Sequence, residues 1–306
     1  MHQRWRNWLS LSASLLLFGS CSNGPVVYRT DSLTKGTIHI SVDETFKPVI
    51  DSQIKVFEAT YPNAKVIAHY KPEADCLKDL KVDSIRMIIV TRGLLPAEEK
   101  ALADTLSFVP PQGKVALDAV ALLVNKENKD SILRVDQVQD ILAGTSKLPL
   151  KPVLDGLTAT STVRYALDSI LRGKPFGKDV TAATSSQGVI DYVAENKNAL
   201  GFVGVSWIGN PEDSMMLSFQ KKVTIVSLQC GICPDTTYVK PYQANIALKR
   251  YPLVRGLHYI LKENWQGLGS GFSNFLIYQQ GQLIFRRAYL WPATMSFSIR
   301  NADMKE

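Results

Sequence analysis

A strand, a turn and a helix follow one another in residues 36–60, GTIHISVDETFKPVIDSQIKVFEAT. Apolar residues alternate with other residues over 36–42, which is the pattern of a strand. They then recur at helical spacing from Val49 to Phe57, and Pro62 ends this predicted helix of residues 47–60. A strand that runs directly into a helix is the basic unit of an α/β fold.

The same unit recurs along the chain. Strands are predicted at 65–70 and 85–90, with a short helix at 76–82 between them. Another helix is predicted from Pro96, because proline and the acidic pair Glu98-Glu99 suit the first turn of a helix. These repeats predict a mostly parallel sheet with right-handed crossovers.

A second α/β unit is predicted after the apolar run of residues 115–124, which only Asp118 interrupts. Its predicted elements are helices near 135–142, after Thr162 and after Ser186, and strands near 152–154 and 201–205. Residues 223–228 are expected to lead back out of this unit through Cys230 to Tyr242. A strand at 253–261 and a helix at 268–278 are predicted to complete the fold.

Three adjacent hydroxyls lie where a turn enters a predicted helix, in residues 154–165, LDGLTATSTVRY. Thr160, Ser161 and Thr162 can donate to an oxyanion at this helix start, and Arg164 offers a planar fork to the same kind of ligand. Capping of the helix is the alternative interpretation, but a cap needs only one hydroxyl oxygen. The stretch therefore favours an anion-binding site.

Similar turns follow other predicted strands, at the edge where open α/β sheets bind ligands. Thr45 and Phe46 follow the first strand, and Thr91 and Arg92 follow the third. A further candidate is the pair at 185–186. Helix capping, or a solvated loop charge for Arg92, remains the alternative for each turn.

The N-terminus predicts export. Residues 1–20 contain Arg4 and Arg6, no acidic residue, and an apolar core, and they end in Gly-Ser before Cys21. Cys21 is the expected lipidated first residue, with an ordinary signal peptide as the alternative. Residues 21–35 are predicted to form a flexible tether. We expect a protein anchored by lipid to a bacterial membrane, facing the periplasm or the cell exterior, with nothing downstream that crosses the bilayer.

Charge and cysteine content narrow the possible partners. Loss of residues 1–20 lowers the formal net charge from +7 to +5. A basic chain suits an anionic ligand, but no stripe of basic and aromatic residues indicates nucleic acid. Cys230 and Cys233 are expected to be a short structural disulfide or two thiols, and Cys76 is unpaired. Four scattered histidines supply no metal-binding spacing, so no metal or cofactor is expected.

Several short motifs occur in an order that resembles the periplasmic phosphate-binding component of ABC phosphate importers. They are the Thr45-Phe46 turn, the RGLL turn at 92–95, LDAVALLVN at 117–125 ahead of VQDILAG at 138–144, the Thr160-Ser161-Thr162 helix start, ALGFV at 199–203, YPLVRGL at 251–257, and residues 272–282. The resemblance covers nearly all of the chain beyond the signal, and the common order is more specific than any single motif.

The resemblance implies a two-lobed periplasmic-binding-protein clamshell (type II), each lobe a mixed, mostly parallel sheet flanked by helices. Lobe 1 is expected at 36–118 and 245–306, and lobe 2 at 119–244. Thr45 and the backbone of Phe46 would bind one phosphate from lobe 1, and Thr160, Ser161 and Thr162 from lobe 2. The expected partners are inorganic phosphate and the permease subunits of an ABC transporter, and the chain is expected to be a monomer.

Two departures from the family pattern leave selectivity open. Thr91 stands where such proteins often have an aspartate that accepts the proton of hydrogen phosphate, and the usual arginine near Gly156 is missing. Arg92 or Arg164 can replace that charge, and Glu73 or Asp75 can supply the acceptor. Sulfate and molybdate are therefore alternative ligands.

A secreted hydrolase is the alternative from another class. S-x-x-K occurs at 52–55 and 218–221, but neither S-D-N nor K-T-G accompanies it. The sequence also lacks G-x-S-x-G, H-E-x-x-H and a Walker loop. We therefore expect binding without catalysis. An adhesive lipoprotein with no small-anion site is a third possibility.

Overall fold

The computed structural model describes residues 30–156, 159–210, 212–234 and 237–295. The predicted signal peptide and the predicted lipidation site, Cys21, lie outside these residues. The described residues from Asp31 onward form one compact unit. Within the described ranges, no helix is long and apolar enough to cross a membrane.

The described strands form a large sheet and a small one. The strands of the large sheet are β1 (Gly36–Asp43), β2 (Ala64–Lys71), β3 (Ile85–Val90), β4 (Gln112–Asn125), β6 (Lys151–Leu154), β7 (Thr181–Ala182), β8 (Ala199–Gly204), β9 (Val223–Ile225), β12 (Val254–Leu261) and β13 (Trp291–Pro292). Their order is β2-β1-β3-β12-β4-β8-β6-β7, with β9 and β13 also paired to β4. The small sheet joins β5 (Ile132–Leu133), β10 (Ser227–Gln229) and β11 (Tyr238–Val239).

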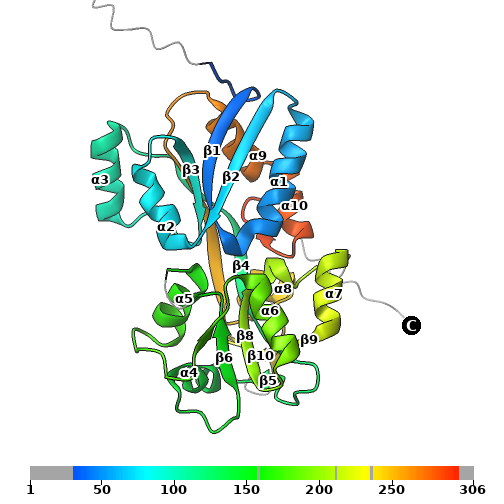
Figure 1. Cartoon of the computed structure of the whole chain (residues 1–306). Coiled ribbons are helices and arrows are strands. Elements are labelled where there is room, and N and C mark those ends of the chain that lie inside the picture. Colours follow the sequence, from blue (N-terminus) through cyan, green and yellow to red (C-terminus); the bar gives the residue numbers. More distant parts are fainter. Residues whose placement is uncertain (1–29, 157–158, 211, 235–236, 296–306) are drawn as a thin grey trace, which may run out of the picture. The chain divides into compact units, whose positions relative to one another are not determined.

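Helices cover this framework. The α-helices are α1 (Lys47–Thr60), α2 (Glu73–Lys78), α3 (Pro96–Leu106), α4 (Val135–Ala143), α5 (Ser161–Tyr165), α6 (Ser186–Glu195), α7 (Ser214–Lys222), α8 (Gln243–Ala247), α9 (Leu268–Ile277) and α10 (Gln279–Arg287). Short helical turns are η1 (Glu44–Phe46), η2 (Asp79–Lys81), η3 (Ala166–Ile170) and η4 (Val205–Trp207). Figure 1 shows α1, α2 and α9 beside β1–β3, and α4–α6 beside β6 and β8.

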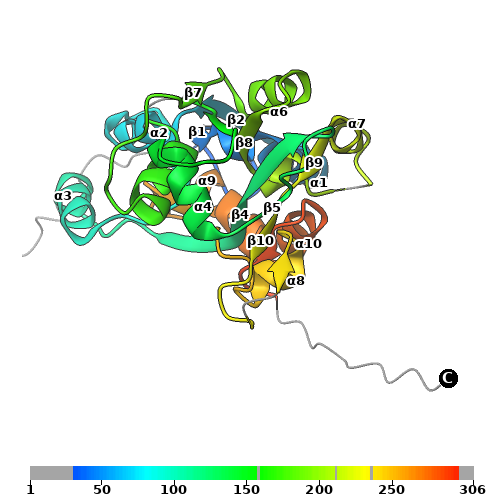
Figure 2. The same ribbon diagram turned by 90° about the horizontal axis from the view of Figure 1, so that it is seen from below.

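The long strand β4 joins two halves of the sheet. Its residues 112–119 pair antiparallel with β12, and Val120–Val124 pair antiparallel with β8. The pairs β1–β2, β1–β3, β6–β8 and β6–β7 are parallel. We call the part with β1–β3 and β12 the first half, and the part with β6–β8 the second half. Figure 2 shows the length of β4 across the sheet.

Helix α1 illustrates how the sequence forms the first half. The helix begins beside Pro48, where the missing proline N–H costs no helical hydrogen bond. Its buried face includes Val49, Ile50 and Phe57. The Phe57 ring packs edge-to-face on Phe272 and Phe275 of α9, with ring centroids 5.2 and 5.3 Å away. This aromatic cluster fixes α1 and α9 against each other.

Most predicted elements are confirmed, and the differences have local causes. The helix predicted over 47–60 and the strand over 85–90 have the predicted bounds. Residues 223–229, for which no strand was predicted, contain β9 and β10. Val226 N–H still donates to Leu122 O of β4, and the chain then pairs with β5 and β11. Helices α7, α8 and α10 were not predicted.

The folded body begins before Gly36, inside the segment predicted as a tether. The Asp31 carboxylate accepts hydrogen bonds from the Arg86 guanidinium (3.0 Å) and from the Leu268 N–H (3.1 Å). Ser32 and Lys35 form an isolated β-bridge. Residues 31–35 therefore contact the first half directly.

Candidate functional site

The turn after β1 places a hydroxyl in the interior. Thr45 lies in η1, is fully buried, and its N–H donates to the Asp43 carboxylate at 3.1 Å. Its carbonyl accepts hydrogen bonds from Trp207 Nε1 (2.7 Å) and Ser206 Oγ (3.2 Å), both in η4 of the second half. The Thr45 turn of the first half is thus held by the second half.

The helix start at α5 supplies three further hydroxyls. Thr160 is the N-cap, and its Oγ1 accepts from the Val163 N–H at 3.2 Å. Capping therefore uses one hydroxyl, and Ser161 and Thr162 are both buried without capping the helix. Ser161 Oγ lies 3.4 Å from Thr45 Oγ1, so the two predicted turns meet. We call the side chains of Thr45, Thr160, Ser161 and Thr162 the hydroxyl cluster.

The carboxylate of Asp155 lies within the hydroxyl cluster. Thr160 Oγ1 donates to its Oδ1 at 2.8 Å, and Thr162 Oγ1 donates to its Oδ2 at 3.1 Å. Thr45 Oγ1 lies 3.5 Å from the same Oδ2. Thr45 and Thr162 therefore point to one shared place between the two halves.

Arg255 of β12 is the central cation of the site and is not among the site residues predicted from the sequence. Its Nη1 donates to Ser161 Oγ at 3.1 Å, and its Nε donates to Asp118 Oδ2 at 2.8 Å. The residue is only 5% exposed, and its Nη2 is buried without a hydrogen-bond partner. The guanidinium lies over the Phe46 ring, 5.3 Å from the centroid. Asp118 is the only polar residue in the apolar run of residues 115–124, and a carboxylate in such a run could have indicated a buried cation beside it.

Burial makes this site electrostatically unusual. Desolvation raises the pKa of Asp43 to about 7, although Arg255 opposes the shift. Burial also raises the pKa of both Asp118 and Asp155, and Arg255 again opposes. Burial lowers the pKa of Arg255, but the carboxylates of Asp118 and Asp43 outweigh it, so the guanidinium keeps its charge. Asp43 Oδ2 and Asp118 Oδ1 are buried without partners, so the site has both a free donor and free acceptors.

A second polar contact joins the halves beside the hydroxyl cluster. Arg164 of α5 donates from Nε to Glu73 Oε2 and from Nη2 to Thr91 Oγ1, each at 2.6 Å. Burial raises the pKa of Glu73, but the hydrogen bond and charge of Arg164 more than offset it, so the pKa is lowered. The Ala74 N–H also donates to Ala159 O at 3.0 Å. Three predicted candidates, Thr91, Arg164 and Glu73, thus bind one another.

The remaining candidates have other contacts. Arg92 donates from both Nη atoms to Glu98 of α3, at 2.6 and 2.8 Å. Asp75 pairs on the surface with Lys78 at 2.8 Å. Ser185 caps α6, and Ser186 Oγ donates to Glu44 Oε2 at 3.1 Å.

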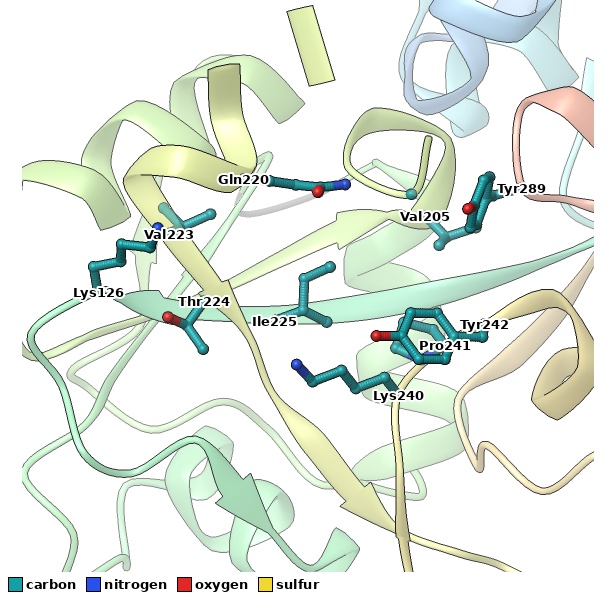
Figure 3. Close-up of a pocket in the computed structure, with 11 residues that line it drawn as sticks. Lys126, Val205, Gln220, Val223, Thr224, Ile225, Lys240, Pro241, Tyr242 and Tyr289 are labelled. Carbon is teal, nitrogen blue, oxygen red and sulfur yellow. The ribbon is translucent and has the colours of Figure 1, made fainter. Parts of the chain in front are cut away.

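A cavity of about 470 Å³ lies apart from the hydroxyl cluster. Figure 3 shows Lys126, Lys240, Tyr242 and Tyr289 among its lining residues. Lys126 and Tyr242 are exposed, and the Gln220 amide donates to Ile208 O. Within the described ranges, none of its lining residues has a buried polar atom without a partner. Among the described residues, Asp43 Oδ2, Asp118 Oδ1 and Arg255 Nη2 are buried without partners, and all three belong to the site around Arg255.

Cysteines and metal ligands do not extend the site. Cys230 and Cys233 form a disulfide, and Cys76 is a buried free thiol whose pKa is raised by burial. No group of three or more histidine, cysteine or acidic side chains with metal-binding geometry occurs in the part of the chain that the structure describes.

Gly204 of β8 permits the close approach of the two halves. A Cβ atom there would lie 2.6 Å from Thr45 Cγ2 and 3.2 Å from Arg255 Nη2. We expect Gly204→Ala to weaken anion binding by about tenfold, a loss of about 1.4 kcal/mol, because the added methyl group must displace Thr45 or Arg255 where the two halves meet. Calorimetric titration with phosphate measures the loss. Gly231→Ala is the control, since a Cβ there meets nothing nearer than 3.9 Å, and equal affinities in both variants would contradict this prediction.

Together, the β4 connection and the polar contacts between the halves define the two-lobed type II fold of periplasmic binding proteins. A family model for a PBP superfamily domain matches residues 29–280, so the chain belongs to this superfamily. The α/β clamshell expected from the sequence is confirmed.

The chain is similar to several named proteins. Phosphate-binding protein PstS of Pseudomonas aeruginosa is 20% identical over 251 residues, which are 76% of this chain and 74% of the relative. A structure from Clostridium perfringens, assigned as a phosphate ABC transporter substrate-binding protein and solved with bound phosphate, aligns with a TM-score of 0.69 and 19% identity. An ABC-type phosphate transport receptor from Vibrio cholerae aligns with a TM-score of 0.62 and 17% identity. Each alignment covers 84% of this chain and 100% of the other, and shows the common fold.

Proposed function

We propose that this chain is an exported binding protein that captures inorganic phosphate between its two lobes and delivers it to an ABC importer. The observation that supports this most is the buried Arg255 Nη2, which has no partner and belongs to a side chain that also contacts the hydroxyl cluster. A charge-assisted hydrogen bond is about twice as strong as a neutral one, so an oxyanion oxygen is the partner that best suits this donor. The names of the relatives support the same ligand.

The proposed ligand contacts come from both lobes. Thr45 and the Phe46 backbone act from residues 36–118 and 245–306, together with Arg255. Thr160, Ser161 and Thr162 act from residues 119–244. In this proposal the hydrogen bonds of Arg164 to Glu73 and Thr91 hold the two lobes together around the ligand. Arg92 remains paired with Glu98.

Asp43 is the proposed acceptor for the proton of hydrogen phosphate. Its Oδ1 is bound by the Thr45 N–H, while its Oδ2 is buried without a partner. Sulfate has no proton to donate, so an ionised Asp43 would face an unpaired like charge and disfavour it. Sulfate and molybdate remain the alternative ligands, and binding alone, without catalysis, is the proposed activity.

The proposal also includes the membrane anchor. Cys21 is the proposed lipidation site, residues 1–20 the signal peptide, and the permease subunits of the importer the proposed protein partner. The lipid would keep the protein beside the importer without a membrane-spanning helix. Mass spectrometry of the membrane fraction tests this proposal, since Cys21→Ser is expected to release the protein.

Removal of the Thr162 hydroxyl tests the proposed ligand site. Thr162→Val keeps the side-chain volume but loses the donor, and we expect phosphate to bind about tenfold more weakly. Isothermal titration of the full-length chain with phosphate, sulfate and molybdate gives the affinities. Thr145→Val removes an exposed hydroxyl of the same lobe and is the matched control. Unchanged phosphate affinity in Thr162→Val would remove this hydroxyl from the site.

A further inference from the structure

We infer that the carboxylate of Asp155 is an internal anion that competes with the ligand for the hydroxyl cluster, so that an oxyanion binds only when Asp155 is displaced. This inference rests on the proposed function. It concerns a residue that directly follows strand β6 and is 6% exposed.

The hydroxyl protons define the competition. A threonine hydroxyl has a single proton to donate. Thr160 and Thr162 each direct that proton to Asp155, at 2.8 and 3.1 Å. The Thr160 oxygen also accepts the Val163 N–H. Neither hydroxyl can therefore donate to a ligand oxygen while Asp155 remains in place.

The charges around the cluster lead to the same conclusion. The buried carboxylates of Asp43, Asp118 and Asp155 surround one buried guanidinium, that of Arg255. Arg255 already forms a 2.8 Å ion pair with Asp118. A second anion placed beside Asp155 would be repelled across a few ångströms of low-dielectric interior. The cluster therefore accommodates either the carboxylate or an oxyanion, but not both.

The unpaired Arg255 Nη2 favours replacement of the Asp155 carboxylate by an oxyanion. Arg255 Nη1 contacts Ser161 Oγ, and its Nη2 is buried with no partner, so Asp155 leaves one strong donor unsatisfied. A tetrahedral oxyanion presents more acceptor oxygens than a carboxylate and can satisfy Nη2 together with the hydroxyls. The ligand thus gains a contact that Asp155 does not make. Asp155 therefore lowers the affinity for the ligand, because binding must first break its hydrogen bonds with Thr160 and Thr162.

Asp155→Asn tests the inference, because the amide keeps the shape and removes the charge. We expect this variant of the full-length chain to bind inorganic phosphate and sulfate at least tenfold more tightly than the wild type in isothermal titrations. Asp179→Asn, which removes an exposed carboxylate from the same half, should bind as the wild type does. Asp155→Ser provides a second variant without the charge, and urea unfolding confirms that each protein is folded.

The outcomes separate this inference from the proposed function. If the wild type binds phosphate and both folded Asp155 variants bind it no more tightly, the competition is overturned and the proposed function is left intact. No binding by the wild type together with binding by Asp155→Asn would support the competition. Failure of the wild type and of both variants to bind any tetrahedral oxyanion would overturn the proposed function, and the inference with it. A phosphate complex in which Asp155 still accepts from Thr160 and Thr162 would also overturn the inference.

Discussion

Arg255→Lys is expected to weaken phosphate binding by about a hundredfold, a loss of roughly 2–3 kcal/mol. The guanidinium donates to Asp118 and Ser161, and its third nitrogen, which has no partner, is the proposed donor to the ligand. A lysine ammonium is a compact point charge and cannot donate to these three groups at once in the planar geometry of a guanidinium. The affinity, measured by isothermal titration with phosphate, should therefore fall sharply although the net charge is unchanged.

The control for this variant is Arg250→Lys. Arg250 is an exposed arginine just before β12, so its replacement should leave the affinity unchanged. If Arg255→Lys binds phosphate as tightly as the wild type and Arg250→Lys, Arg255 does not contact the ligand.

Asp118→Asn is expected to lower the free energy of unfolding by roughly 3 kcal/mol. The Asp118–Arg255 pair is almost fully buried, and loss of one partner leaves an uncompensated charge in the interior. Because asparagine keeps the shape and one acceptor oxygen, the change reports charge more than packing. Urea unfolding measures it as a lower midpoint with an unchanged slope.

Asp104→Asn provides the comparison at the surface. Asp104 pairs with Lys100 at 2.9 Å, but its side chain is 67% exposed, and such pairs contribute about 0–1 kcal/mol. Equal stability of Asp118→Asn and Asp104→Asn would contradict this account of the buried pair.

Local patterns in the sequence were sufficient for much of the fold. Helix α1 and strand β3 have the predicted bounds because their apolar spacing and flanking residues are local signals. Helix α10 was not predicted, although its residues are amphipathic, and its buried face combines Phe285 with Gly281 and Gln282. The Gln282 amide donates to the nearby Leu276 O and also to Val115 O of β4, a contact with a distant segment that composition does not reveal.

The candidate site was predictable to a similar extent. The Thr45 turn and the Thr160–Thr162 helix start were identified from strand-to-helix turns, and the structure brings them within 3.4 Å. Their role in ligand binding stays a prediction. Arg255 was not identified because its function depends on pairing between β12 and β4, which places it opposite Asp118 from a distant part of the sequence. The Arg164–Glu73 pair likewise depends on how the two halves meet.

A crystal structure of the full-length protein grown with phosphate would locate the ligand itself. We expect one phosphate between the halves, within hydrogen-bond distance of Arg255 Nη2, Thr45 Oγ1 and Thr162 Oγ1. A phosphate bound only in the cavity lined by Lys126 and Lys240, with the groups around Arg255 unchanged, would contradict this expectation.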